Sequence, residues 1–213
     1  MSTRAKRDAS LTDYARPSVA VDTAVLTVRD GALCVGLLTD ERTRRRRLPG
    51  TFLHEGEVLA DAVRRSLREK AGIRDVEPAQ LHVFDAVDRD SRGWVLSVAH
   101  MAVVRANALG TLDALPVPDA VGLDFDHDAI VAFAVERVRA DYADRADPSG
   151  LLDEPFTIRS LREVHEAVLG HRLQPDTFRR RVLPQLDEVG AVRRGGVGKP
   201  ASLFARRPST RSS

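Results

Sequence analysis

The segment from residue 48 to residue 73 constrains the fold of this chain more than any other. It reads LPGTFLHEGEVLADAVRRSLREKAGI, so a Pro-Gly turn leads through an acidic loop into a helical pattern that stops at Gly72. Leu59, Val63 and Leu67 recur every four residues, which puts them on one helical face that we expect to pack against a core. Glycine directly after the last periodic residue commonly ends a helix. The segment therefore predicts a turn, a polar loop and an amphipathic helix.

This spacing resembles the Nudix box, which reads G, five residues, E, seven residues, R-E-U-x-E-E-x-G-U, where U is a bulky aliphatic residue. Laid on the chain from Thr51, the motif is matched by Glu57, Arg65, Leu67, Glu69, Gly72 and Ile73. The resemblance implies the Nudix fold, an α/β/α sandwich. The alternative interpretation is an ordinary amphipathic helix that happens to follow a Pro-Gly turn.

The departures from the motif concern its metal site. Ser66 and Lys70 replace two of the three glutamates in the R-E-U-x-E-E core. In the family these glutamates hold the magnesium ions that polarise a diphosphate, and magnesium requires several oxygen ligands. Residues four apart share a helical face, so a hydroxyl and an ammonium stand where two carboxylates would be. We therefore predict a retained scaffold with no catalytic residues, no metal site and a vestigial Glu69.

Composition predicts a chain with packed cores and an uneven charge. The 213 residues are 43% hydrophobic and 30% charged, which allows one large or two small domains. Residues 151–213 carry 12 Lys and Arg against 7 Asp and Glu, a net charge of +5, so residues 1–150, with 21 against 24, carry −3. A basic C-terminal part joined to a slightly acidic N-terminal part favours a polyanionic partner for the C-terminal part alone.

The single cysteine and the hydropathy bear on location. Cys34 lies in a strand-like run and has no cysteine partner, which is typical of a small buried residue in a reducing compartment. The chain has no N-terminal apolar leader and no run of about eighteen apolar residues. We expect a cytoplasmic protein with no membrane partner.

Hydrophobic patterning predicts two domains. We expect a disordered tail over 1–17, a Nudix-like α/β (α+β) domain over 18–146, a linker over 147–154, a second domain over 155–207 and a tail over 208–213. In the first domain, strands are predicted over 19–28, 32–38, 81–85 and 94–105, and an irregular loop over 107–122. A helix is predicted over 129–142, with Asp126 or Asp128 as its cap.

The second domain has the element order of a winged helix-turn-helix. Thr157 can cap a helix that ends at Gly170, a second helix is predicted over residues 177–188, and residues 191–194 and 201–206 flank a glycine-rich turn as a β-hairpin. We assign Phe178 and Phe204 to its core. The alternative is a helical interaction domain whose arginines only keep it soluble.

A recognition helix fits the major groove, where its polar side chains reach base edges and phosphates, and a glycine-rich wing tip lets the backbone approach DNA closely. The residues of suitable type on the predicted helix and wing are Thr177, Arg179, Arg180, Arg181, Arg193, Arg194 and Lys199. We predict that they contact double-stranded DNA.

The two halves together resemble the NrtR-type transcriptional regulators of NAD metabolism, over residues 19–207. The resemblance is carried by the degenerate box and by DRDSRGWVLSVAHMAVV, LDFDHDAI, FRRRVL and RRGGVGKPASLF. It implies a homodimer that represses NAD-synthesis or salvage genes from a palindromic operator. It also implies that ADP-ribose or a related NAD-derived nucleotide is the effector, with no cofactor.

We expect the effector diphosphate close to Arg47, Phe52 and Glu57, with Arg89 reaching in from the loop after the box. Arg47 ends a run of four arginines, which could also be an ordinary solvated loop. Two further functions stay open. One is a working Nudix hydrolase of ADP-ribose or another nucleoside diphosphate, and the other is a regulator that keeps the Nudix shell only for dimerisation.

Overall fold

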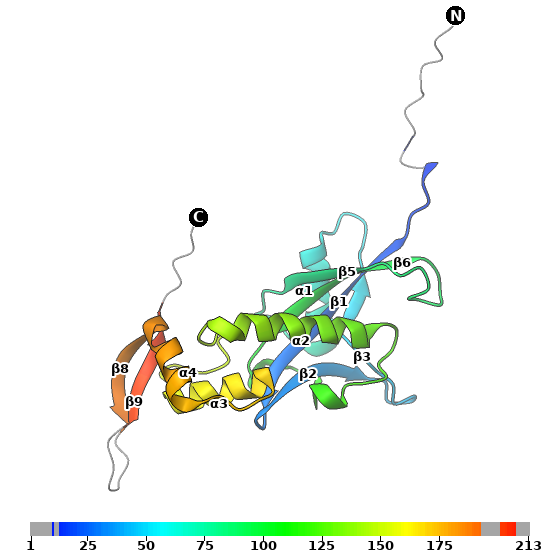
Figure 1. Cartoon of the computed structure of the whole chain (residues 1–213). Coiled ribbons are helices and arrows are strands. Elements are labelled where there is room, and N and C mark those ends of the chain that lie inside the picture. The colour runs from blue at the N-terminus through cyan, green and yellow to red at the C-terminus, as the bar shows by residue number, and fades with distance from the viewer. Residues whose placement is uncertain (1–9, 11–12, 193–200, 208–213) are drawn as a thin grey trace, which may run out of the picture.

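A mixed seven-stranded sheet organises the N-terminal part of the protein (Figure 1). The computed structural model describes residue 10, residues 13–192 and residues 201–207. The strands are β1 (Ser18–Arg29), β2 (Ala32–Thr39), β3 (Arg46–Arg47), β4 (Gly50–Phe52), β5 (Ala79–Phe84), β6 (Val95–Val103) and β7 (Asp113–Pro116). They follow the order β3-β2-β1-β6-β5, with β4 paired to β1 and β7 to β2. The central strand β1 is parallel to β6 and antiparallel to β2.

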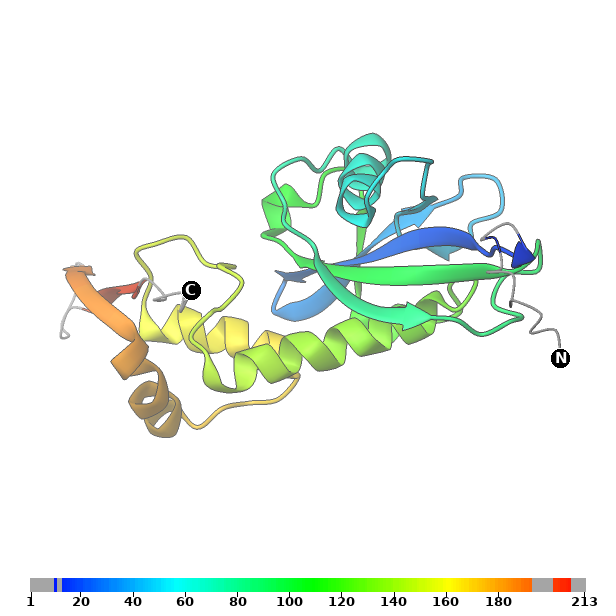
Figure 2. The ribbon, with the colours of Figure 1, turned by 90° about the horizontal axis from the view of Figure 1, so that it is seen from above.

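Two helices cover the two faces of this sheet, as Figure 2 shows. Successive side chains of a strand point to opposite faces, so Val21 and Val25 of β1 pack with α1 (Leu59–Ala71), while Ala24 and Leu26 pack with α2 (His127–Asp144). The predicted α/β/α sandwich is confirmed. None of the helices in the described part of the chain is long and apolar enough to cross a membrane.

The predicted local features of the sandwich are largely confirmed. Gly72 ends α1 in the left-handed conformation, with a φ of 70°. Cys34 is buried in β2, and burial raises the pKa of its thiol.

The C-terminal part is a winged helix-turn-helix, as predicted. It consists of α3 (Ile158–Leu169), α4 (Pro175–Val182), β8 (Leu186–Val192) and β9 (Ala201–Arg206). Thr157 caps α3 by accepting the Ser160 N–H at 3.1 Å, and the Thr157 N–H is bonded to Ser160 Oγ in return. Phe178 and Phe204 lie in the core of this domain, as predicted.

Helix α3 packs beside α2 and joins the winged domain to the sandwich. Val168 of α3 belongs to the same buried cluster as Ile130 and Val138 of α2, and the two helices run side by side in Figures 1 and 2. Between them, Asp147 is fully buried and accepts hydrogen bonds from Tyr142 Oη at 2.7 Å and Arg206 Nη1 at 2.6 Å. Asp147, which follows α2, therefore makes a buried polar contact between the sandwich and the winged domain.

Two sequence predictions are wrong, and a third is confirmed only in part. Residues 107–122 are not an irregular loop, because they form β7 on the edge of β2 and two short 3₁₀ helices, Ala106–Ala108 and Val117–Asp119. The recognition helix ends at Val182 instead of residue 188, because Leu183–Gln185 tightens into a 3₁₀ turn and β8 starts immediately afterwards. Asp126 stands at the N-cap position of α2, as predicted, but its side chain makes no capping hydrogen bond because it binds Arg89, while Asp128 accepts the Leu123 N–H.

Candidate functional site

A pocket of about 290 Å³ opens where α1, β1 and the start of α2 meet. It is lined by Ala20, Asp22, Arg47, Leu48, Gly50, Thr51, Phe52, Lys70, Arg89, Asp90, Arg92, Val95, Phe125 and His127. Three of the four residues predicted to meet the effector, Arg47, Phe52 and Arg89, line this pocket. Glu57, the fourth, does not.

Glu57 is held by Arg65 of α1. The guanidinium donates from Nε to Glu57 Oε1 and from Nη2 to Oε2, each at 2.9 Å, and also to Thr51 Oγ1 and the Phe52 carbonyl. These bonds from Arg65 lower the pKa of Glu57 to about 2. The pair fixes the loop before α1, which includes one wall of the pocket, because a bidentate Arg–carboxylate contact restricts geometry as well as charge.

Asp22 forms the floor of the pocket within an otherwise apolar stretch of β1. It accepts the Ser97 hydroxyl at 2.6 Å, with His127 Nε2 at 3.5 Å and Arg89 Nη2 at 3.6 Å. Burial alone would raise the pKa of Asp22, but His127, Ser97 and Arg89 together lower it. His127 Nδ1 accepts the Leu48 N–H at 3.0 Å, so its other nitrogen carries the hydrogen that faces Asp22.

Arg89 forms its hydrogen bonds with another side chain of the protein. Its Nε and Nη2 atoms donate to the two oxygens of Asp126 at 2.9 and 2.6 Å, and its side chain is only 3% exposed. It ties the loop before β6 to the start of α2. An incoming anion would meet a guanidinium whose charge is already compensated.

Arg92 sits between two aromatic rings at the pocket entrance. Its guanidinium carbon lies 5.5 Å from the centre of the Phe52 ring and 5.4 Å from that of Phe125, and both rings are partly exposed. Its nitrogen atoms donate to Asp90, and these bonds lower the pKa of Asp90 to about 2. Two phenyl rings on either side of a planar group make a slot that also suits a flat base.

The box positions that depart from the motif do not form a metal site. Lys70 Nζ donates to the Gly50 carbonyl inside the pocket, while Ser66 is buried and its hydroxyl has no hydrogen-bond partner among the described residues. Glu69 is outside the pocket and half exposed, beside Arg68. Over the described ranges, no three His, Cys, Asp or Glu side chains are grouped so that they could hold a metal ion. The residues present do not fit magnesium.

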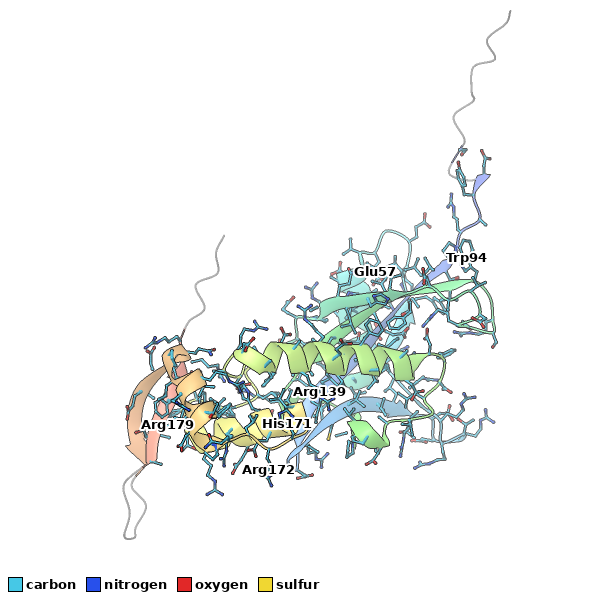
Figure 3. The ribbon with its side chains drawn as sticks, viewed as in Figure 1. Glu57, Trp94, Arg139, His171, Arg172 and Arg179 are labelled. Carbon is cyan, nitrogen blue, oxygen red and sulfur yellow. The ribbon has the colours of Figure 1, made fainter. Side chains whose placement is uncertain are left out.

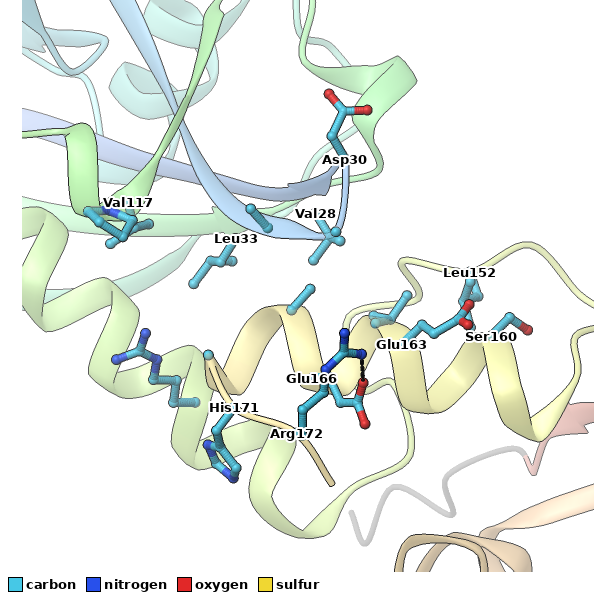
Figure 4. A pocket seen from close by; sticks show the side chains of 17 residues that line it. Val28, Asp30, Leu33, Val117, Leu152, Ser160, Glu163, Glu166, His171 and Arg172 are labelled. Atoms are coloured by element: carbon cyan, nitrogen blue, oxygen red, sulfur yellow. Dashed lines mark hydrogen bonds and ion pairs between the residues drawn. The ribbon is translucent and has the colours of Figure 1, made fainter. Parts of the chain in front are cut away.

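A larger cavity of about 890 Å³ lies between the β1–β2 turn and α3 (Figure 4). Its charged side chains have protein partners. Arg172 donates to Glu166 at 2.9 Å, and Arg139 donates to the Val168 carbonyl at 3.2 Å. None of the residues predicted from the sequence to bind the effector lines it. We therefore assign the smaller pocket, with its excess of cations, as the candidate ligand site.

The second candidate site is the exposed face of α4, and Arg179 of this helix lies at the opposite end of the molecule from Trp94 (Figure 3). Four residues of this helix that were predicted to contact DNA are exposed: Thr177, Arg179, Arg180 and Arg181. Phe178 and Val182 bury the other face of the helix. The predicted wing residues Arg193, Arg194 and Lys199 lie outside the described residues.

Glu166 fixes the turn that sets the direction of α4. It is 8% exposed, and its carboxylate accepts the Leu173 N–H and an Arg172 N–H, each at 2.9 Å. The Leu173 N–H, together with Arg172 and Arg162, lowers the pKa of Glu166. The turn that precedes the exposed arginines of α4 is thus held by hydrogen bonds to one buried carboxylate.

Sequence reasoning missed Asp22, His127, Arg92 and Phe125 as pocket residues. Asp22 had a signal, since it is a lone charged residue in the apolar run VAVDTAVLTV. Lys70 was recognised only as a substituted metal ligand and not as part of a binding surface. For Arg92 and Phe125, the chain offers no local pattern that would bring them to the same slot.

Comparison with known proteins agrees with this geometry. A family model described as "NrtR DNA-binding winged helix domain" matches residues 148–205. The "ADPR responsive transcriptional repressor NtrR" of Acinetobacter baylyi is 28% identical over 208 residues, which cover 90% of this chain and 83% of the relative.

Two solved structures from Shewanella oneidensis resemble the chain. NrtR complexed with a 27mer DNA is 31% identical, with 89% of this chain and 93% of that one covered and a TM-score of 0.73. The NUDIX domain of the same protein, complexed with ADP ribose, is 26% identical, with 62% and 94% covered and a TM-score of 0.53. Because the identity with the DNA-bound NrtR extends over nearly the full length of both chains, this chain belongs to the NrtR family.

Proposed function

We propose that this protein is a DNA-binding transcriptional repressor of NAD-synthesis or salvage genes whose operator affinity is controlled by ADP-ribose or a related NAD-derived nucleotide. The observation that carries the proposal is the exposed arginine face of α4 on a winged helix-turn-helix. A helix of this kind, with Thr177 near its start and Arg179, Arg180 and Arg181 along it, suits the major groove and the flanking phosphates. A relative of the same architecture, NrtR of Shewanella oneidensis, has been solved in complex with a 27mer DNA.

The nucleotide belongs in the 290 Å³ pocket. Arg47 and Lys70 supply positive charge, and the Phe52 and Phe125 rings supply flat apolar surface at the entrance. These are the groups that a diphosphate and a base require. The solved complex of the NUDIX domain of Shewanella oneidensis NrtR with ADP ribose supports this choice of effector.

Hydrolysis is the alternative activity, and the described residues give it little support. A metal-dependent reaction needs carboxylates around the diphosphate, yet Glu57 is tied to Arg65, and Glu69 does not line the pocket. We infer that the Nudix-like domain binds its nucleotide without cleaving it. Magnesium-dependent release of AMP from ADP-ribose, abolished in Glu69→Gln, would support the hydrolase instead.

Helix α2 offers a physical connection between the two sites. It begins at His127, which lines the pocket. Near its end, the Tyr142 ring lies 5.0 Å from the His165 ring of α3, which lies 5.0 Å from Phe178 of α4. We propose that a nucleotide which shifts the start of α2 also shifts α4, so that operator affinity falls by the nucleotide's differential affinity for the two arrangements.

The direct test is fluorescence anisotropy of a labelled duplex from upstream of the protein's own gene, with and without ADP-ribose and at two salt concentrations. We expect tight, salt-sensitive binding that exceeds binding to scrambled DNA and weakens with ADP-ribose. The Arg180→Ala/Arg181→Ala variant should lose about a hundredfold in affinity, because two contacts to DNA disappear.

The matched control removes the same charge elsewhere. Arg137→Ala/Arg145→Ala changes two exposed arginines, one in α2 and one directly after it, that pair with Asp141, and it should retain operator binding. Equal losses in both double variants would argue against α4 as the DNA face. DNA binding that does not change with ADP-ribose would support a regulator but exclude ADP-ribose as its effector. It would favour the alternative in which the Nudix-like domain serves only dimerisation.

We further propose a homodimer that binds a palindromic operator, and the exposed edge of the sheet supports it. Within the described residues, strand β5 pairs only with β6, and Val83 of β5 and Phe133 of α2 are 39% and 43% exposed. Val83→Lys should shift the sedimentation coefficient from dimer to monomer, because a charge opposes edge pairing. Val121→Lys, at a valine 72% exposed outside this edge, is the control. A dimer that survives Val83→Lys would move the interface elsewhere.

A further inference from the structure

We propose that the ammonium group of Lys70 replaces a divalent metal ion in the pocket, so that this protein binds the diphosphate of its effector without magnesium. The inference rests on the proposed function, because it names the group that receives the effector's negative charge. The fold family implies magnesium, whereas the residues that line the pocket do not fit it.

Lys70 occupies a cation position within the pocket. It stands on α1 where the motif has a glutamate, and its ammonium donates to the Gly50 carbonyl oxygen. Gly50 packs directly on Asp22, since a Cβ added at residue 50 would lie 1.9 Å from Asp22 Oδ1. The positive charge is therefore held near a carbonyl oxygen and a buried carboxylate, and two of the three ammonium hydrogens remain for a ligand.

The charges around the pocket are unbalanced in the direction that a diphosphate requires. Four cationic residues line it against two carboxylates, Asp22 and Asp90. Arg89 and Arg92 are ion-paired with Asp126 and Asp90 at 2.6 Å. Arg47 and Lys70 have no salt bridge within the part of the chain that the structure describes.

These two uncompensated cations act on each other. Burial first, and then the charge of Arg47, lower the pKa of Lys70. A diphosphate between Arg47 and Lys70 would remove this repulsion and make charge-assisted hydrogen bonds to both, which are stronger than neutral ones. The pocket is thus complementary to a diphosphate before any metal ion is added.

The test is calorimetric titration of the full chain with ADP-ribose, in excess EDTA and in excess magnesium. Wild type should bind with equal affinity in both buffers. Lys70→Gln should lower the affinity about tenfold to a hundredfold in both, since a hydrogen bond to a charged group is lost. Arg47→Gln, which removes the other uncompensated cation from β3, should weaken binding in the same way.

Arg68→Gln is the matched control, because it removes one positive charge from the same helix outside the pocket, where Arg68 is half exposed. It should bind as wild type does. Lys70→Glu restores a carboxylate at the motif position and should bind in magnesium better than in EDTA. Thermal unfolding of each variant checks that the fold is retained.

The outcomes separate this inference from the proposed function. Wild-type binding that requires magnesium, or normal binding by Lys70→Gln, would overturn the role of Lys70 and leave ADP-ribose as effector. If ADP-ribose gives no heat, inorganic pyrophosphate is the second probe. EDTA-resistant binding of pyrophosphate that Lys70→Gln abolishes would keep the inference and reject the effector, and no binding of either probe would overturn both.

Discussion

Replacing Asp147 by alanine is expected to lower the free energy of unfolding by about 3–5 kcal/mol, the usual effect of removing one partner from a buried ion pair. The carboxylate is fully buried and accepts four hydrogen bonds, from Tyr142, Leu151, Leu152 and Arg206, at 2.6 to 2.9 Å. Alanine would leave two backbone N–H groups without their acceptor and would remove the buried acceptor of the Arg206 guanidinium, which would keep, within the described residues, only Glu154 and the Leu152 carbonyl. It also suits the residue's φ of +47° poorly.

Urea unfolding followed by circular dichroism measures this loss. Asp147→Asn should cost less, about 1–3 kcal/mol, because asparagine tolerates the left-handed conformation and keeps one acceptor oxygen. Asp153→Ala is the matched control in the same segment, since Asp153 is 83% exposed and paired only with Arg105. It should cost less than about 1 kcal/mol. Equal losses in Asp147→Ala and Asp153→Ala would contradict the anchoring role of Asp147.

Asp147 also illustrates the limit of sequence reasoning. Its neighbours Pro148, Ser149 and Gly150 have the composition of a linker, and the pattern carries no sign that Tyr142 and Arg206 converge on the carboxylate. A contact between residues 59 positions apart depends on the assembled fold. Features that depend on a few consecutive residues were predictable, such as the cap of α3 at Thr157 and the end of α1 at Gly72.

The residues of the candidate pocket also fall into those that a local motif predicted and those that it did not. Arg47 and Phe52 flank the Pro-Gly turn of the box, so a local motif was enough to bring them to one place. Asp22 was predicted only as part of a strand, because its partners Ser97 and His127 come from distant elements. The assignment of residues 113–116 to a loop failed for a related reason. The short strand β7 is stabilised by pairing with β2 and has little β-forming pattern of its own.

The winged domain contains a buried histidine that should make the protein less stable in mild acid. His165 is 1% exposed, and its Nε2 accepts the Asp147 N–H at 3.2 Å, which requires a neutral ring. Burial, above all, lowers the pKa of His165 to about 4 from an ordinary 6.5. Between these values the unfolded chain binds a proton that the folded protein does not. Stability is therefore greatest above about pH 6.5 and falls as the pH drops toward 4.

The free energy of unfolding, measured in urea at about pH 7 and about pH 5, should fall by about 2 kcal/mol more in wild type than in His165→Gln. Glutamine cannot take up the proton, but its amide oxygen can still accept the Asp147 N–H. Glu57 and Asp90, whose pKa values are about 2, titrate below this window in both proteins. His171→Gln, at an exposed histidine of the same domain, should retain the wild-type slope. Parallel pH profiles for wild type and His165→Gln would mean that the folded protein accommodates a protonated His165 between Tyr142 and Phe178.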